Sequence, residues 1–172
     1  YELTSAPSTF FAAQRESVIN VENFKGDDKQ HAVMANIKKL SVPLSNFANV
    51  KTGLVAYEVG KGTPPQTKTM KESRVYHSRT KNGSEWKEYL QGADVSRYSM
   101  IWSGEFICYG DNLAAPRKDY SLYSTKRILV RQIPNKPPYC IHACYTDKEI
   151  LNDRNSMNVI NIKAAPLAIL AV

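Results

Sequence analysis

Cysteine is scarce in this chain of 172 residues: there are three, an odd number, at Cys108, Cys140 and Cys144. So sparse a set argues against a disulfide framework and predicts a reducing cytoplasm. Long apolar runs are also lacking, since the longest stretch, residues 164–172, is interrupted by Pro166 and is too short to span a bilayer. No basic segment followed by an apolar one opens the chain, so no secretory signal is expected. We therefore expect a cytoplasmic protein with no membrane partner.

Acidic side chains are too few to balance the basic ones, because 23 lysines and arginines stand against 16 acids, a net charge of +7. The excess lies in residues 61–140, which have fourteen basic and seven acidic side chains, whereas basic and acidic residues balance on either side of this segment. A basic central segment in a balanced chain is expected of a protein that binds a polyanion. A solvated basic face that serves solubility is the alternative.

The length and composition fit one domain with a substantial core, since 42% of the residues are hydrophobic and 23% are charged. The chain begins with Tyr1 instead of Met, and its last residues resemble the start of a helix, so we expect a fragment of a longer polypeptide. Residues 1–36 are interpreted as a lead-in segment and short helix from a missing upstream domain. Residues 37–172 are interpreted as the main domain.

The spacing of apolar residues predicts one early helix and several short strands. Apolar positions recur between Ala32 and Leu40, after the acidic pair Asp27 and Asp28, and Pro43 follows, which favours a short amphipathic helix. Runs of apolar and β-branched residues predict strands at residues 47–50, 54–59, 105–109, 127–133, 139–145 and 157–162. This pattern predicts an α+β fold, a mostly antiparallel, curved β-sheet with a few short helices.

One pattern resembles part of a catalytic site. Residues 135–139 read Asn-Lys-Pro-Pro-Tyr, and adenine methyltransferases hold a flipped base with an Asn/Asp-Pro-Pro-Tyr/Phe loop. Lys136, directly before the prolines, has no acceptor for the base amino group, and no glycine-rich strand–turn–helix for S-adenosylmethionine lies upstream. We interpret the segment as a Pro-Pro turn between strands.

Two other patterns are also interpreted as structural. Cys140, His142 and Cys144 would share one face of a strand, but three ligands from one strand converge poorly on a metal ion. Glu85 and Lys87 match half of a nuclease motif, without the upstream Pro-Asp pair that would complete a magnesium site. We therefore predict no catalytic residue, no metal site and no cofactor site in this chain.

Three further segments have more specific patterns: residues 89–98 (YLQGADVSRY), residues 106–118 (FICYG, then LAAPRK) and residues 126–133 (KRILVRQI). In this order and spacing they resemble the TaqI-like C-terminal specificity domain, a family fused to adenine-specific DNA methyltransferases that include type IIG restriction-modification enzymes. The patterns PLSNF at residues 43–47 and KTGL at residues 51–54 resemble the start of the family pattern. The resemblance extends over roughly residues 37–163.

The resemblance implies sequence-specific recognition of double-stranded DNA by a module that is not catalytic by itself, so residues 37–172 would be a DNA target-recognition domain. It also implies a covalently linked N-terminal domain that binds S-adenosylmethionine and methylates adenine, and an endonuclease fused further upstream in type IIG enzymes. Two alternatives stay open: a specificity subunit that serves a separate methyltransferase, and a basic protein-interaction domain that binds an acidic partner.

The residues expected to contact DNA lie in turns, basic loops and one strand. We expect Gly92 and Asp94 to form a turn that presents Arg97 and Tyr98, and a local pair between Asp94 and Arg97 is an equal alternative. The candidate DNA-binding residues are Lys61, Arg74, Arg97, Tyr98, Arg117, Lys118, Lys126, Arg127, Arg131 and Gln132.

Their expected roles differ. Arg117 and Lys118 follow a proline in an exposed loop and are expected to meet phosphates, whereas Arg131 and Gln132 are expected to read bases. Arg127 shares a strand face with Arg131, and a hydrogen-bonded structural role for at least one of the two stays open. We expect the basic residues as a whole to form one continuous surface shaped to a double helix.

Overall fold

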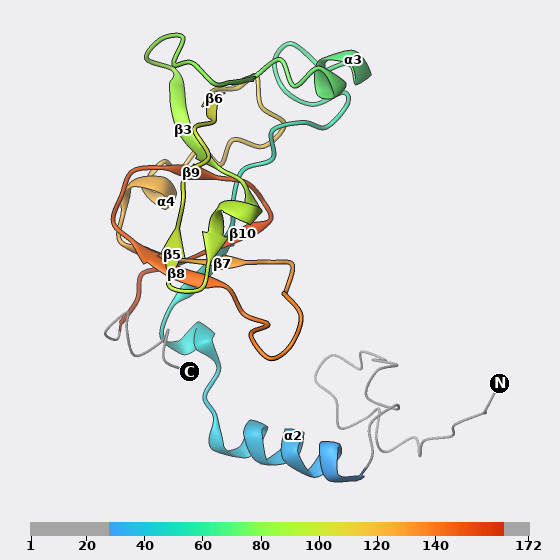
Figure 1. Ribbon diagram of the computed structural model, residues 1–172, viewed down its shortest axis with the longest axis vertical. Coiled ribbons are helices and arrows are strands. Elements are labelled where there is room, and N and C mark those ends of the chain that lie inside the picture. Colours follow the sequence, from blue (N-terminus) through green and yellow to red (C-terminus); the bar gives the residue numbers. More distant parts are fainter. Residues whose placement is uncertain (1–27, 164–172) are drawn as a thin grey trace, which may run out of the picture. The chain divides into compact units, whose positions relative to one another are not determined.

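A computed structural model describes residues 28–163 of the chain (Figure 1). The chain divides into two units between Pro43 and Leu44, and each is described by itself. In the first unit, helix α2 (Asp28–Leu40) has two lysines in its last turn. The helix predicted from the apolar spacing is thus confirmed, and the expected boundary between residues 36 and 37 falls inside it.

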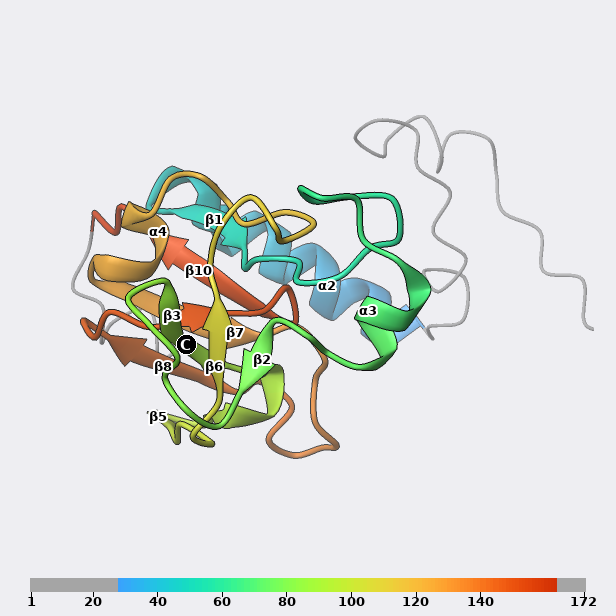
Figure 2. The same cartoon turned by 90° about the horizontal axis from the view of Figure 1, so that it is seen from above.

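The second unit contains a four-stranded antiparallel sheet in the order β1–β10–β7–β8. Its strands are β1 (Asn49–Thr52), β7 (Arg127–Arg131), β8 (Ala143–Thr146) and β10 (Ser156–Ile160). β1 and β8 are therefore the two opposite edges of this first sheet, which Figure 2 shows from above.

A second sheet has the order β2–β6–β3–β9, and β4 and β5 form a separate hairpin. Its strands are β2 (His77–Ser78), β3 (Trp86–Leu90), β6 (Phe106–Cys108) and β9 (Leu151–Asn152), and the hairpin consists of β4 (Val95–Ser96) and β5 (Ser99–Met100). β3 pairs in parallel with β9, whereas the other strand pairs of this sheet are antiparallel. With the short helices, these sheets form an α+β fold, as predicted.

Short helical segments lie before and between the strands of the second unit: η3 (Leu44–Asn46), α3 (Lys68–Glu72), η4 (Gly92–Asp94) and α4 (Ser121–Ser124). The Thr67 hydroxyl accepts the N–H of Met70 at 3.2 Å and caps the start of α3. α3 ends where Arg74 takes a φ of 50°, in the left-handed region that often terminates helices. Within residues 28–163, no helix is long and apolar enough to cross a membrane.

The alternation of side chains along β7 decides which of its residues share a face of the first sheet. Leu129 packs in a buried cluster that includes Val95 of the hairpin, whereas Ile128 packs in a different buried cluster. Because successive side chains point to opposite faces, Arg127 and Arg131 lie on the same face as Leu129, as expected.

Two of the predicted strands differ from the observed ones. Residues 54–59 form no strand, since Leu54 and Val55 make only single bridges, to Asp153 and Ala115. Of residues 139–145, only the last three belong to β8. The prolines shortly before them lack the N–H donor that a sheet ladder requires. β2 and β3 were not predicted, because their mixed polar and apolar residues form strands only through their pairing with β6 and β9.

Candidate nucleic-acid interface

A tight turn precedes the β4–β5 hairpin, and the carboxylate of Asp94 closes it. Its Oδ2 atom accepts the backbone N–H of Gln91 at 2.8 Å and the hydroxyl of Ser103 at 3.2 Å. The N–H of Ile101 donates to the Asp94 carbonyl at 2.9 Å, beyond the hairpin. The predicted turn is therefore confirmed, and the alternative local pair with Arg97 is wrong, because Asp94 takes these other partners instead.

The loop of the β4–β5 hairpin consists of Arg97 and Tyr98, and both side chains are exposed. Tyr98 has a φ of 63°. Glycine or asparagine is more usual in this left-handed region, which costs other residues on the order of 1 kcal/mol. The N–H of Tyr98 donates to the carbonyl of Ala143 at 2.7 Å. The backbone of the hairpin loop is thus attached to β8 while its two side chains stay accessible.

The guanidinium group of Arg97 lies against two aromatic rings. Its central carbon is 5.1 Å from the ring centroid of Tyr98 and 4.5 Å from that of Tyr139. A hydrogen bond to the Tyr98 hydroxyl raises the pKa of Arg97, and its length is 3.4 Å. Ring contacts of this kind orient a guanidinium through its face and leave most of its N–H donors available.

Tyr139 belongs to the loop between β7 and β8, residues 132–142, which lies beside the hairpin. The N–H of Asn135 donates to the Cys140 carbonyl at 2.9 Å and closes this loop. Ile133, Tyr139 and Ile141 are exposed by 60%, 60% and 68%, and exposed apolar side chains in adjoining segments are typical of a binding site. We define the hairpin–loop surface as Arg97, Tyr98, Ile101, Gln132, Ile133, Tyr139 and Ile141.

Arg127, at the start of β7, is a correction to the predicted site. Its side chain is completely buried, and its guanidinium donates to the carbonyls of Thr125, Lys148 and Ile150 at 3.1, 3.2 and 2.6 Å. Burial lowers the pKa of Arg127 to about 10, so the group stays charged at neutral pH. A side chain so enclosed cannot reach DNA, and Arg127 is the structural arginine of the strand.

Arg131, at the other end of β7, is half-buried, and Gln132 after it is exposed. Arg131 lines a pocket of about 220 Å³ under the Gly92–Asp94 turn, together with Ile133, Asp153 and Asn155. The backbone N–H of Gln132 donates to the Asn155 carbonyl at 2.7 Å, which leaves its side chain at the start of the exposed loop.

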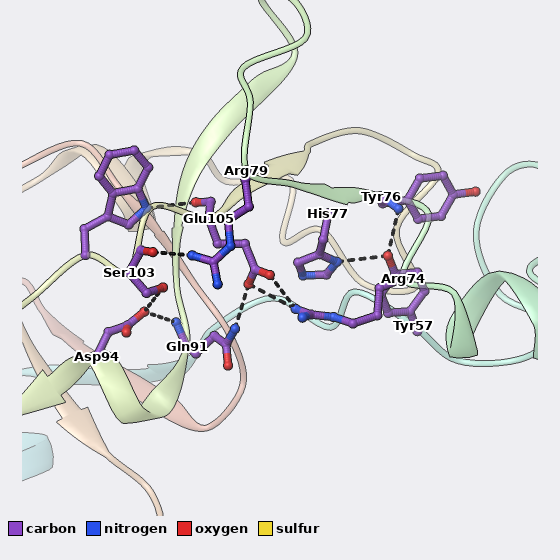
Figure 3. A network of polar contacts seen from close by, with 10 residues as sticks. Tyr57, Arg74, Tyr76, His77, Arg79, Gln91, Asp94, Ser103 and Glu105 are labelled. Carbon is purple, nitrogen blue, oxygen red and sulfur yellow. Dashed lines mark hydrogen bonds and ion pairs between the residues drawn. The ribbon is translucent and has the colours of Figure 1, made fainter.

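A polar network lies behind the hairpin and engages another predicted residue, Arg74 (Figure 3). Arg74 donates to both carboxylate oxygens of Glu105, at 2.9 and 3.0 Å, and the Gln91 side chain donates to the same carboxylate at 2.8 Å. The Glu105 side chain is only 6% exposed. Arg74 therefore neutralises a buried acid next to the Gly92–Asp94 turn. About half of the Arg74 side chain remains exposed, and only this half is accessible to a ligand.

The same view shows His77, which is partly buried, beside this pair. The Tyr57 hydroxyl accepts the N–H of Tyr76 at 2.8 Å and is hydrogen-bonded to Nδ1 of His77 at 2.9 Å. Burial is the main cause that lowers the pKa of His77 to about 4 and raises the pKa of Tyr57 to about 12. Both groups are therefore neutral at physiological pH.

Two other predicted residues, Arg117 and Lys118, line a separate pocket of about 340 Å³ at the β1 edge of the first sheet. Arg117 has a φ of 61° and donates through Nε to the Gly53 carbonyl at 3.2 Å. We define the β1-edge pocket as Lys51, Thr52, Arg117, Lys118, Asp119, Leu122 and Ile160.

The predicted basic residues thus do not form one continuous strip. Arg97 lies beside β8, and Arg117 lies beside β1, at the opposite edge of the same sheet. Lys61 and Lys126 are exposed but line neither pocket. The expectation of a single basic surface is wrong in this form, and the exposed basic residues fall into separate groups.

Sequence reasoning missed two residues of these surfaces: Tyr139 of the hairpin–loop surface and Lys51 of the β1-edge pocket. Tyr139 was considered only as part of the Pro-Pro-Tyr pattern, and its contact with Arg97 joins segments some forty residues apart. Lys51 lies in the KTGL pattern, which was noted as a resemblance and not as a site. In both cases the residue stands in a recognisable pattern, but nothing along the sequence indicates which distant residue it lies beside.

The cysteines and the nuclease-like pattern were interpreted as structural, and their places can now be described. All three cysteines are free thiols, and Cys144 is buried in β8 while Cys140 lies in the preceding loop. In the part of the chain that the structure describes, no group of three or more His, Cys, Asp or Glu side chains is arranged to hold a metal ion. Lys87 of the Glu-x-Lys pattern lies in β3, 6.0 Å from the ring centroid of Tyr120.

These features define a small α+β binding domain, with an exposed arginine between two tyrosines and apolar side chains around it. Residues 87–171 match the family of TaqI-like C-terminal specificity domains, and this part of the chain belongs to that family. The membership indicates a role in the DNA sequence specificity of restriction-modification enzymes. A comparison with curated proteins finds no match to the chain.

The matched residues contain the three segments that carry the resemblance, from Tyr89 to Ile133. They also contain the whole hairpin–loop surface, whereas the patterns at residues 43–47 and 51–54 lie outside the match. The match begins later than the roughly 37–163 expected from the sequence, and its last residues, 164–171, lie outside the described part of the chain.

Proposed function

We propose that the hairpin–loop surface contacts double-stranded DNA and reads its base edges, as the non-catalytic recognition module of a type IIG-like adenine-specific methyltransferase. The observation that carries this proposal is the environment of Arg97, an exposed guanidinium oriented by Tyr98 and Tyr139, most of whose donors have no partner among the described residues. An arginine whose planar group is oriented in advance loses less entropy when it binds.

The chemistry of this surface suits base edges in a groove. The fork of Arg97 matches the O6 and N7 acceptors of guanine, and the amide of Gln132 matches the N6 and N7 positions of adenine. The exposed isoleucines and tyrosines match the methyl group of thymine or an unstacked base. Arg131, at the rim of the 220 Å³ pocket, is a second candidate base contact next to this surface.

The proposed parent enzyme is inferred from the family that residues 87–171 match. We propose that an N-terminal domain covalently linked to this module binds S-adenosylmethionine and flips and methylates an adenine, while the residues of this module bind the duplex. An endonuclease fused further upstream would make the parent enzyme type IIG. A methyltransferase signature of the Asn-Pro-Pro-Tyr type in the same gene would support this arrangement. Its presence in a separate gene would instead support a specificity subunit.

The direct test is binding of the chain to short duplexes, measured by fluorescence anisotropy over a range of salt concentrations. We expect log affinity to fall linearly with log salt, by about 0.9 for each phosphate contacted, and Arg97→Ala to weaken binding to the preferred sequence roughly 10- to 100-fold. Lys68→Ala is the matched control, because this lysine is exposed on α3 and pairs with Glu72 of the same helix. Affinity that is indifferent to salt, or equal for wild type and Arg97→Ala, would contradict the proposal.

A protein-interaction domain is the second candidate, and the exposed isoleucines of the hairpin–loop surface favour it. Apolar contacts dominate such an interface, so its affinity would depend little on salt. Failure to bind any duplex, together with salt-independent binding to the linked or neighbouring subunit, would support this candidate over DNA recognition.

A further inference from the structure

The β1-edge pocket contains an arginine whose backbone is held on both sides. The Tyr109 hydroxyl donates to the carbonyl of Arg117 at 3.0 Å, and the Tyr123 hydroxyl donates to the carbonyl of Pro116 at 3.2 Å. Between these two anchors, Arg117 takes the left-handed φ of 61°, which a branched or long side chain rarely adopts. The surrounding tyrosines thus maintain a conformation that the local sequence alone does not favour.

The side chain of Arg117 is held as firmly as its backbone. Nε donates to the Gly53 carbonyl at 3.2 Å, and one terminal nitrogen donates to the Thr52 hydroxyl at 2.8 Å. The Gly53 N–H donates to the Ser156 carbonyl at 3.2 Å, and the chain packs so closely here that a Cβ would clash with the Asp153 carbonyl oxygen. A guanidinium has five N–H donors, so the remaining ones belong to a group of fixed orientation that lines the pocket.

The charge of the pocket favours an anion. Lys51 and Lys118 line it beside Arg117, and both lysines are exposed. Asp119 is the opposing acid, and its Oδ1 accepts the N–H and the hydroxyl of Ser121 at 3.1 and 2.6 Å. The pocket therefore has three positive side chains against one carboxylate that is already engaged, beside the apolar side chains of Leu122 and Ile160.

We propose that the β1-edge pocket binds a phosphate group, held by the fork of Arg117 and by the ammonium groups of Lys51 and Lys118. This inference rests on the proposed function in one respect: the phosphate is a phosphodiester of the DNA backbone. Three strand spacings separate β1 from β8, about 14 Å, which is close to the width of about 12 Å of the major groove. A phosphate at one edge and base contacts at the other are thus compatible with one duplex.

The first arm of the test uses inorganic phosphate and the full chain labelled with ¹⁵N. We expect phosphate to shift the NMR signals of the Arg117 Nε–H and of the Lys51 amide, and the double change Lys51→Ala and Lys118→Ala to abolish these shifts. The two lysines are exposed, so their removal leaves the fold intact, and Lys68→Ala is again the control. Unperturbed signals at saturating phosphate would overturn the phosphate site whether or not the chain binds DNA.

The second arm uses a short duplex and separates the sources of phosphate. We expect the same signals to shift with duplex, and the double variant to bind every sequence roughly tenfold more weakly, with a salt slope smaller by about 0.9. Shifts with inorganic phosphate but not with duplex, while the Arg97-dependent binding persists, would overturn the DNA backbone as the source and leave the proposed function standing. If the wild-type chain binds no duplex but still binds phosphate, the proposed function fails and the anion site remains.

Discussion

The two ends of β7 have the same side-chain chemistry and opposite surroundings. Arg127 begins the strand and Arg131 ends it, on the same face, four residues apart. Arg127 is completely buried among three backbone carbonyls, whereas Arg131 lines an open pocket and is followed by the exposed Gln132. A basic residue in a matching motif is therefore not by itself a DNA contact, because the segments packed over it decide whether it is accessible.

Arg74 and Arg97 differ in the same way, one bound to a buried group and the other accessible. Arg74 is committed to the buried Glu105, and its ion pair supports the turn that precedes the hairpin. Arg97 contacts the faces of two exposed tyrosines and forms no ion pair within residues 28–163. Basic residues that bond to buried groups therefore stabilise the domain, whereas Arg97 of the hairpin–loop surface is available to a partner.

The largest effect should come from the buried end of β7. Arg127→Ala removes a fully buried guanidinium that bonds three backbone carbonyls, so we expect the free energy of unfolding to fall by about 3 kcal/mol or more, measured by urea denaturation. Lys126→Ala, an exposed neighbour, should change it by less than about 0.5 kcal/mol. Loss of DNA affinity in Arg127→Ala without loss of stability would reverse our assignment of this arginine to the interior.

In the loop of the β4–β5 hairpin, stability and binding should respond in different directions. Tyr98→Gly removes the ring beside Arg97 but accommodates the φ of 63°, so we expect unfolding free energy to stay level or rise by up to about 1 kcal/mol. Duplex affinity should fall roughly tenfold, since an aromatic contact to a base is lost. Tyr98→Asn is the control, because asparagine also tolerates this backbone and has no ring. Unchanged affinity in both variants would remove Tyr98 from the interface.

A smaller effect should distinguish residues that read bases from those that hold phosphates. We expect Gln132→Ala to relax the preference at one base pair by about 1 kcal/mol and to leave the salt slope unchanged, measured with a panel of single-substitution duplexes. Lys118→Ala should instead weaken binding to all members of the panel alike. If both variants act uniformly across the panel, Gln132 is not a base reader.

A pH-dependent effect concerns the partly buried His77. The unfolded chain protonates His77 below its ordinary pKa of 6.5, whereas the folded chain does so only near 4, because burial disfavours the charged imidazole. Between these values the unfolded state binds more protons, so this contribution to stability is present above pH 6.5 and is lost as the pH falls toward 4. His77→Gln should flatten this part of the stability profile in denaturation series between pH 7 and 4.5. Parallel profiles for the two proteins would show that His77 is protonated without penalty in the folded state.

The sequence alone determined the features that depend on neighbours along the chain. The 3.6-residue period predicts α2, and the two-residue period of residues 127–131 predicts that Arg127 and Arg131 share a face. Gly92 and Asp94 predict the turn, because Asp94 binds the backbone three residues earlier. The family motifs predict the specificity domain, since they too are local patterns.

Only the tertiary structure decided which of these residues are accessible and which lie together. Strands of two residues, such as β2 and β9, have no period to detect and exist only through their partners. Burial of Arg127 depends on carbonyls more than twenty residues away, and the Arg97–Tyr139 contact joins two loops that no local rule connects. The division of the basic residues between the β1 and β8 edges follows from strand order, because an antiparallel sheet separates segments by pairing and not by their distance along the sequence.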